Sequence, residues 1–195
     1  MIAVVEYEAG NVRSVLNALR RCGIGDPVLT AREDLLKAAD KVILPGVGDA
    51  SVALESLRRA GLDRIILALE RPVLGICVGM QILCERTEEG NAEGLGIFRT
   101  AVRRFRPSGD LKIPHMGWNT LTALQNPLFD GLDEGTYVYY VHSYYADICP
   151  DTIARTDHGI PFSAALCRGN FFGTQFHPEK SGPAGARILQ NFLSL

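Results

Sequence analysis

The amino-acid sequence predicts an α/β fold, built as a single three-layer domain over residues 1–195. In the first half, short apolar runs alternate with segments of helical periodicity, which is the pattern of a parallel sheet covered by helices. In the second half, apolar runs follow one another through tight turns, which predicts antiparallel additions to the mostly parallel central sheet. A chain of 195 residues suits one domain, and no Pro/Gly/Ser-rich linker divides it.

The elements of the first half follow from apolar spacing and from stop signals. Gly23 stands where the first helix should end, and Thr30 with Glu33 forms a capping-box pattern at the start of the second. Strands are predicted over residues 2–6, 42–44 and 73–76, and helices over residues 11–21, 30–39, 51–59, 62–70 and 78–85.

The second half is predicted to be mainly strand. Strands are expected over residues 97–105, 137–145, 152–156, 162–167 and 171–176. A final helix opens at Ser181, because Pro183 stands in its first turn and an apolar stripe follows.

The composition excludes several classes of protein. With 47% hydrophobic and 22% charged residues the chain lies within the globular averages, so disorder, collagen-like repeats and coiled coil are excluded. The formal net charge of −2 gives no reason to expect nucleic acid or an anionic membrane as a partner. No apolar run approaches the roughly 18 residues of a membrane span, and the N-terminus lacks the basic flank of a signal peptide. We therefore expect a cytoplasmic protein without a membrane partner.

Five dispersed cysteines and four histidines form no ligand pattern. The odd number of cysteines and the absence of C-x-x-C argue against a disulfide framework and against zinc. No H-E-x-x-H or similar cluster is present. We expect no metal and no cofactor.

The strongest chemical signal is Gly75-Ile76-Cys77-Val78-Gly79, which lies between an apolar strand and a helix. A nucleophile elbow needs small residues on both sides of the nucleophile, because the strand-to-helix turn is tight. The helix N-terminus favours thiolate at Cys77, and the N–H of Val78 can stabilise an oxyanion. The alternative is an inert core cysteine. Such a structural role is expected for the remaining cysteines, including Cys84 on the predicted helix 78–85.

A base and its orienting group are predicted in Thr174-Gln175-Phe176-His177-Pro178-Glu179. Pro178 favours an extended His177, so that His177 and Glu179 can project to one side. Glu179 can then accept the second imidazole N–H and fix the tautomer. A surface turn is the alternative, but together with the elbow this segment predicts a Cys-His-Glu triad.

A third element, Pro45-Gly46-Val47-Gly48, directly follows a predicted strand. Backbone N–H groups in such a loop commonly complete an oxyanion hole, and glycines allow a peptide to switch conformation. Taken alone, the pattern also fits an ordinary strand-to-helix turn. We interpret Gly46, Val47 and Gly48, together with Val78, as candidate oxyanion residues.

These three elements, in this order, resemble the class I (triad) glutamine amidotransferases over essentially the whole chain. The resemblance implies a flavodoxin-like domain that hydrolyses L-glutamine to glutamate and ammonia through a cysteinyl thioester, with Cys77 as nucleophile, His177 as base and Glu179 as orienting carboxylate. It also implies a set of substrate-binding residues, which are Gln81, Glu89, Ser143 and Tyr144.

Within the family, the PGVG loop, His115–Asn119 and the segment from Gln175 to Ser181 resemble the glutaminase subunits of histidine biosynthesis. This resemblance implies a heterodimer with a separate (β/α)₈-barrel cyclase, which consumes the ammonia and whose occupancy activates the glutaminase. It also implies docking residues, which are Asn11, Trp118, Tyr139 and Lys180.

Three other interpretations remain open from the residues. A glutaminase could serve anthranilate, aminodeoxychorismate, GMP or pyridoxal phosphate synthesis, although the PGVG and HMGWN patterns disfavour these. A peptidase or γ-glutamyl hydrolase could share the elbow, and a non-catalytic redox module could keep an exposed thiol. The complete Cys77, His177 and Glu179 set favours a hydrolase that acts on free glutamine.

Overall fold

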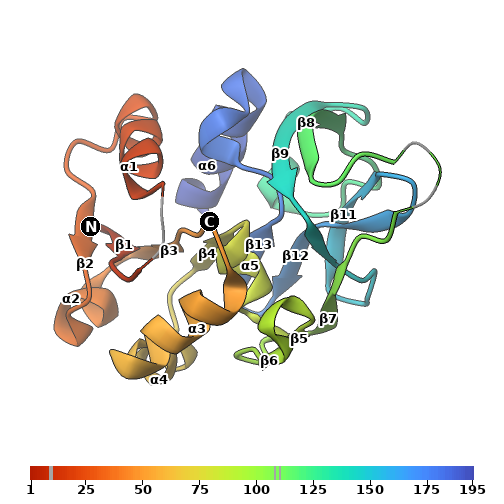
Figure 1. Ribbon diagram of the computed structural model, residues 1–195. Helices are drawn as coiled ribbons and strands as arrows, with labels where there is room; N and C mark the ends of the chain where they lie inside the picture. Colours follow the sequence, from red (N-terminus) through yellow and green to blue (C-terminus); the bar gives the residue numbers. More distant parts are fainter. Residues whose placement is uncertain (9–10, 108, 110) are drawn as a thin grey trace.

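A long mixed sheet runs through the molecule, with helices on both of its faces (Figure 1). The computed structural model describes residues 1–8, 11–107, 109 and 111–195. The parallel half of the sheet consists, in spatial order, of β2 (Val28–Thr30), β1 (Ile2–Val5), β3 (Lys41–Leu44), β4 (Val73–Ile76) and β13 (Phe171–Thr174). The predicted α/β fold class is confirmed.

The sheet continues from β13 through strands of the second half of the chain. They are β12 (Pro161–Arg168), β10 (Tyr144–Ala146), β7 (Phe98–Arg104), β5 (Cys84–Thr87) and β6 (Ala92–Glu93), with β11 (Thr152–Asp157) paired to β12. Most of these pairings are antiparallel, as predicted, but β5 runs parallel to β7.

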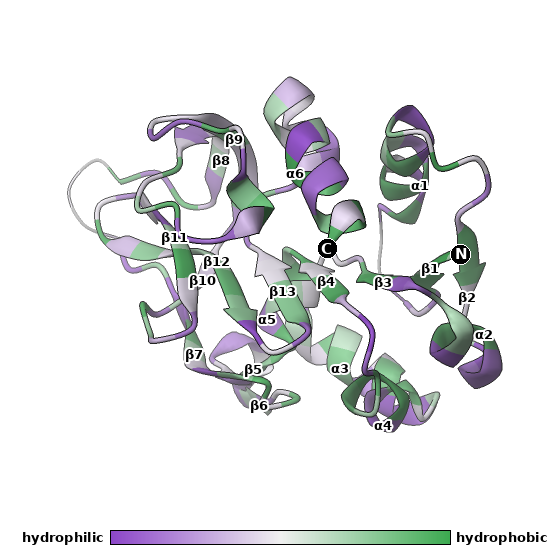
Figure 2. Ribbon diagram, turned by 180° about the vertical axis from the view of Figure 1, so that it is seen from behind, coloured by the Kyte–Doolittle hydropathy of each residue, from purple (hydrophilic) through white to green (hydrophobic). Residues whose placement is uncertain are grey.

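Helices cover the sheet because each carries one apolar face. One side holds α1 (Val12–Arg21) and α6 (Gly182–Ser194); the other holds α2 (Glu33–Ala38), α3 (Ala50–Arg59) and α4 (Leu62–Leu67) (Figure 1). On α1, Val15, Ala18 and Leu19 are buried, and Gly23 beyond its end has φ +91°. Figure 2 shows this pattern, with green central strands and purple on the outer turns of α1 and α2.

The central parallel strands β3 and β4 are mainly apolar, with Lys41 at the start of β3 as the exception. All four residues of β3 and all four of β4 are buried, because helices cover both faces of the sheet. Among the described residues, no helix is long and apolar enough to cross a bilayer.

Two helix predictions need correction. Thr30 does not cap α2: it ends β2, a strand that was not predicted, and its hydroxyl accepts a hydrogen bond from Arg32 N (3.0 Å). The helix predicted over residues 78–85 is a single turn, α5 (Val78–Gln81), and Cys84 lies in β5 instead. Cys84 is nevertheless fully buried, as expected.

The strand predicted over residues 137–145 is divided at Ser143. Its first part, β9 (Tyr137–His142), leaves the main sheet and pairs with β8 (His115–Thr120), which was not predicted; its second part is β10. The strand predicted over residues 171–176 as an antiparallel addition is antiparallel on one side only. It is observed as β13, which pairs antiparallel with β12 but parallel with β4, where Gly173 lies opposite Gly75. This pairing brings the carboxyl ends of β4 and β13 to the same edge of the sheet.

Candidate active site

Cys77 stands at a sharp turn between β4 and α5. Its backbone has φ +53° and ψ −109°, a conformation that non-glycine residues rarely adopt and that is held here by the surrounding chain. The N–H of Cys77 donates to the carbonyl of Thr174 on β13 (2.7 Å), and the N–H groups of Met80 and Gln81 donate back to its carbonyl. Because α5 has four residues, the thiol is supported by one helical turn rather than by the two predicted.

The glycines around the elbow are needed for close backbone packing. A Cβ on Gly75 would lie 2.6 Å from the carbonyl oxygen of Gly79, and a Cβ on Gly79 would lie 2.0 Å from that of Leu44. A Cβ on Gly46 would lie 2.5 Å from Gly79 N. The predicted oxyanion loop therefore lies directly against the first turn of α5.

His177 and Glu179 form a buried pair at the end of β13. Glu179 lies in the 3₁₀ turn η3 (Pro178–Lys180), and Oε1 of its carboxylate accepts from His177 Nδ1 at 2.8 Å. The same oxygen accepts a hydrogen bond from the side-chain amide of Asn11. The other imidazole nitrogen, Nε2, is buried and has no hydrogen-bond partner among the described residues. That nitrogen is the one available to exchange a proton with Cys77.

The charge state of His177 is set by opposing influences. Burial acts to lower its pKa, but the neighbouring Cys77 sulfur and the Glu179 carboxylate outweigh burial and raise the pKa to about 9. A protonated His177 beside the Cys77 sulfur is thus favoured at neutral pH, and an imidazolium in this position is what a cysteine nucleophile uses.

The predicted oxyanion loop follows β3. The hydroxyl of Tyr7 donates to the carbonyl of Pro45, which holds the start of the loop. Gly48 has φ +101°, in the region that favours glycine, and a Cβ at this position would meet no atom within 4 Å. The loop thus has a hydrogen-bonded start at Pro45 and a conformationally free glycine at Gly48.

A cavity of about 370 Å³ opens beside Cys77, within the usual size range of small-molecule sites. It brings Cys77, the predicted nucleophile, together with predicted oxyanion residues and with all of the predicted substrate-binding residues. The predicted residues in its lining are Val47, Gly48, Cys77, Val78, Gln81, Glu89, Ser143 and Tyr144, and the additional ones are Arg104, Pro114, Val141 and His142.

Comparison with known families agrees with this arrangement. The family model described as Glutamine amidotransferase class-I matches residues 3–195. The chain belongs to the class I glutamine amidotransferases. Two solved structures share the amidotransferase fold: one described as a glutamine amidotransferase (TM-score 0.76, 18% identity, covering 99% of this chain and 97% of that one), and one described as a glutamine amidotransferase from Thermotoga maritima (TM-score 0.66, 18% identity, 99% and 82%).

More similar relatives of this amidotransferase carry a narrower name. A Bacteroides fragilis protein named imidazole glycerol phosphate synthase subunit HisH is 54% identical over 195 residues, covering 100% of this chain and 99% of the relative. A protein of the same name from Escherichia coli is 43% identical over 196 residues, with the same coverage.

Glu89 enters the amidotransferase cavity from the 3₁₀ turn η1 (Glu89–Asn91). Its Oε2 accepts from the N–H of Ala50 at the start of α3 (2.7 Å), so that the carboxylate also caps this helix. Burial raises the pKa of Glu89 above its usual value, and the Ala50 hydrogen bond opposes that change. One carboxylate oxygen is therefore fixed by the protein, which orients the other.

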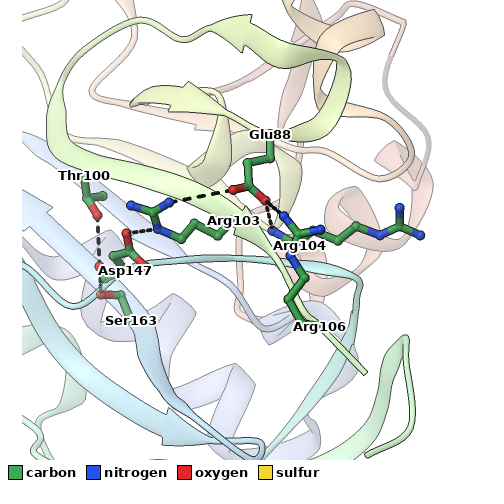
Figure 3. Close-up of polar contacts among 7 residues, drawn as sticks. All are labelled: Glu88, Thr100, Arg103, Arg104, Arg106, Asp147 and Ser163. Atoms are coloured by element: carbon green, nitrogen blue, oxygen red, sulfur yellow. Dashed lines mark hydrogen bonds and ion pairs between the residues drawn. The ribbon is translucent and has the colours of Figure 1, made fainter. Parts of the chain in front are cut away.

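The neighbouring Glu88 holds the turn in place (Figure 3). Its carboxylate accepts from the backbone N–H of Arg104 (2.9 Å) and lies within ion-pair distance of Arg103 and Arg106. Arg103 also pairs with Asp147 beyond β10. These partners connect the turn that carries Glu89 to β7, the strand that supplies Arg104.

The predicted docking residues of the amidotransferase gather around the ribbon formed by β8 and β9. Trp118 is 55% exposed and meets Tyr139 edge-to-face with ring centroids 5.9 Å apart, and Lys180 Nζ lies 6.0 Å from the centroid of Tyr139. Met116 and Tyr137 extend this exposed apolar face. Asn11 differs from the others, because its side chain is turned toward Glu179. These exposed side chains make the outer face of the ribbon a candidate interaction surface.

The inner face of the same ribbon carries a directed chain of hydrogen bonds. His142 Nδ1 donates to the carbonyl of Tyr144 (2.7 Å), so its Nε2 accepts from His115 Nδ1 (2.8 Å), and His115 Nε2 in turn accepts from the Asn119 side chain (3.1 Å). Burial lowers the pKa of His142 to about 3 and that of His115 to about 4. Both imidazoles are therefore neutral, each in one tautomer.

The buried, neutral imidazoles of His142 and His115 predict that the free energy of unfolding decreases in acid. A histidine with a depressed folded-state pKa stabilises the protein above pH 6.5, and this contribution is lost as pH falls toward the folded-state value of about 3. For His142 the loss between pH 7 and pH 4.5 is about 3 kcal/mol. We expect urea unfolding of a His142→Gln variant to lose less stability over this interval than wild type. Parallel losses in the two proteins would contradict the prediction.

Sequence reasoning did not identify Arg104, Pro114, Val141 or Gln175 as part of the site. Arg104 is one residue of a strand with no local motif, and Val141 contributes its backbone carbonyl, 4.0 Å from the Cys77 sulfur. Gln175 stands within the predicted triad segment, but only the folded chain brings its side chain to Cys77. Among the described residues, no group of three or more acidic, Cys or His side chains is arranged to hold a metal.

Proposed function

We propose that this chain is the glutaminase subunit of an imidazole glycerol phosphate synthase. It hydrolyses L-glutamine to glutamate and ammonia, and it delivers the ammonia to a (β/α)₈-barrel cyclase subunit, which makes imidazole glycerol phosphate and AICAR in histidine biosynthesis. The observation that carries this proposal is the 54% identity to a HisH subunit over the full length of both chains. We also propose that residues 1–195 form one amidotransferase domain and that the protein acts in the cytoplasm.

The chemistry begins with the Cys77 sulfur, which attacks the side-chain carbonyl carbon of glutamine. The carbonyl oxygen becomes an oxyanion, stabilised by backbone N–H groups of Val47 and Val78. His177 gives its proton to the leaving nitrogen, the C–N bond breaks and ammonia departs, leaving a γ-glutamyl thioester on Cys77. His177 then takes a proton from water, which hydrolyses the thioester to glutamate. Glu179 holds the imidazole orientation throughout.

The cavity supports recognition of a free amino acid. The carboxylate of Glu89 suits the α-ammonium group, and Ser143 and Tyr144, which also line the cavity, would contact the α-carboxylate end through their backbone. The side-chain NH₂ group of Gln81 donates hydrogen bonds to Tyr144 O and to Gln175 Oε1 (both 3.0 Å). Its side-chain oxygen is therefore the atom that would accept a hydrogen bond from the substrate.

The cyclase partner is supported by the exposed face of the β8–β9 ribbon. Trp118 and Tyr139 on this face suit an interface anchor, and Lys180 follows directly from the triad residue Glu179. The ribbon also contacts the site, because the carbonyl of Val141 lies beside the Cys77 sulfur. A partner seated on the ribbon would thus act on the strand that lies beside the Cys77 sulfur.

The proposal is tested by glutamate release from glutamine, measured on the chain alone and with the barrel cyclase and its nucleotide ligand. We expect low activity alone and an increase of about 100-fold or more with the liganded cyclase, which is the effect of completing one oxyanion donor. High activity of the isolated chain would contradict the partner assignment. No activity in either case, with the protein folded, would contradict the glutaminase.

A further inference from the structure

Gln175 lies between β13 and His177, and its side chain is completely buried. Its backbone N–H donates to Ala164 O (2.8 Å), which fixes the start of the segment against β12. Its side-chain Nε2 lies 3.6 Å from the Cys77 sulfur, within hydrogen-bond range for a sulfur acceptor. A buried carboxamide thus touches the atom that carries the chemistry, although no step described above uses it.

The orientation of this carboxamide is determined by its neighbours. The carbonyl oxygen of Tyr144 can only accept, so the Gln81 group facing it must be the NH₂ group (3.0 Å). The same NH₂ group then donates to the side-chain oxygen of Gln175 (3.0 Å). Since that oxygen faces Gln81, the NH₂ group of Gln175 faces Cys77. A flipped Gln175 would oppose its NH₂ group to the NH₂ group of Gln81 and lose that hydrogen bond.

A fixed N–H donor beside a buried sulfur acts on the thiol and the thiolate differently. The ionised sulfur is the better acceptor, so the hydrogen bond stabilises thiolate more than thiol. Cys77 is only 3% exposed, so water contributes little to this stabilisation. The donor and the His177 imidazolium would both act on the same thiolate, the first by a directed bond and the second by charge.

We propose that Gln175 is a positioning residue for the nucleophile: held by Gln81, it donates a hydrogen bond to the Cys77 sulfur and links that sulfur to the Tyr144 carbonyl. The Tyr144 carbonyl also accepts from His142, so the chain of hydrogen bonds that starts at Asn119 on the inner face of the ribbon ends at the nucleophile. The inference rests on Cys77 being the nucleophile of the proposed function. Its test uses thiol chemistry, which requires neither glutamine nor the cyclase.

The test is the pH dependence of Cys77 alkylation by iodoacetamide, quantified on the peptide that contains Cys77. Gln175→Glu keeps the volume and the acceptor for Gln81 but replaces the donor by an acidic group, and Gln175→Met removes both polar contacts. We expect the midpoint of the profile to rise by about one pH unit in the Glu variant and by less in the Met variant. Thr174→Val is the matched control, because this adjacent buried hydroxyl has no hydrogen-bond partner among the described residues.

Gln175→Met separates positioning from packing, because it removes the donor without adding a charge beside the sulfur. If Gln175 only supported Gln81 and filled space, Gln175→Met would leave the midpoint at the wild-type value, and that result would overturn the proposal. Should Gln175→Met not fold, as judged by thermal unfolding, Gln175→Leu is the second uncharged variant and the same criterion applies to it. A loss of glutaminase activity with an unchanged alkylation profile would also count against the proposal, whereas a shifted profile in a chain without glutaminase activity would retain it and reject the proposed function alone.

Discussion

Replacing Cys77 by alanine is expected to lower glutamine hydrolysis by at least about 10⁴-fold, because covalent catalysis is lost with the sulfur. The serine variant is expected to fall nearly as far. A hydroxyl ionises far less readily than a thiol, so the His177 imidazolium, with its pKa raised to about 9, activates a serine much less well than a cysteine. The loss should appear in kcat, since the cavity residues that would bind glutamine are unchanged.

The measurement is glutamate release in the presence of the cyclase and its nucleotide ligand, together with the affinity of the two chains for each other. Docking should be unchanged, because Cys77 is 3% exposed whereas the face around Trp118 is open. Cys167→Ser is the matched control: this half-buried cysteine lies near the end of β12, and burial raises its thiol pKa. Activity near wild type in Cys77→Ala would exclude the proposed mechanism, and a similar loss in Cys167→Ser would point to misfolding instead.

The parts of the site that could be predicted from the sequence are those that local chain geometry determines. The turn at Cys77 needs Gly75 because a Cβ there would meet Gly79 and Met80 of the same turn, so this requirement is visible in consecutive residues, whereas Gly79 is needed against Leu44 of β3. The His177–Glu179 contact is likewise local, because a proline between the two residues and a two-residue separation bring the side chains together. Local features of this kind can be predicted without knowledge of the remaining fold.

The parts that could not be predicted depend on pairing between distant segments. Residues 78–85 have helical periodicity, but the carbonyls of Ile82 and Leu83 accept from the N–H groups of Leu95 and Ile97, so the helix ends after one turn. Tertiary pairing here outweighs local propensity. The break at Ser143 has the same origin, because β9 pairs with β8 while β10 pairs with β7. That break places Ser143 and Tyr144 in the cavity.

Gly79→Ala is expected to be the most damaging single-methyl substitution at the elbow, with a loss of about 3 kcal/mol or more in the free energy of unfolding. The added Cβ would lie 2.0 Å from the carbonyl oxygen of Leu44 and 3.0 Å from its carbonyl carbon. Neither side can yield easily, because Leu44 is the last residue of the buried strand β3 and Gly79 lies within the first turn after Cys77.

Urea unfolding of Gly79→Ala, compared with wild type, checks this expectation. Gly25→Ala is the matched control, since a Cβ at Gly25 meets nothing within 4 Å, and its stability should stay within about 0.5 kcal/mol of wild type. A Gly79→Ala protein as stable as Gly25→Ala would show that the loop and the elbow are not in the contact described here.

The same contact makes Gly79→Ala a test of function as well as of stability. Leu44 leads directly into the oxyanion loop, and Gly46 of that loop packs on Val78 and Gly79, so relief of the clash must separate the loop from the elbow. Where the variant still folds, we expect glutamine hydrolysis to fall by about 10²-fold or more, because donors of an oxyanion hole act only within hydrogen-bond distance of the developing charge. Alkylation of Cys77 should be affected much less, because that reaction develops no oxyanion. A glutaminase defect with retained thiol reactivity would therefore locate the damage in the loop rather than in the nucleophile.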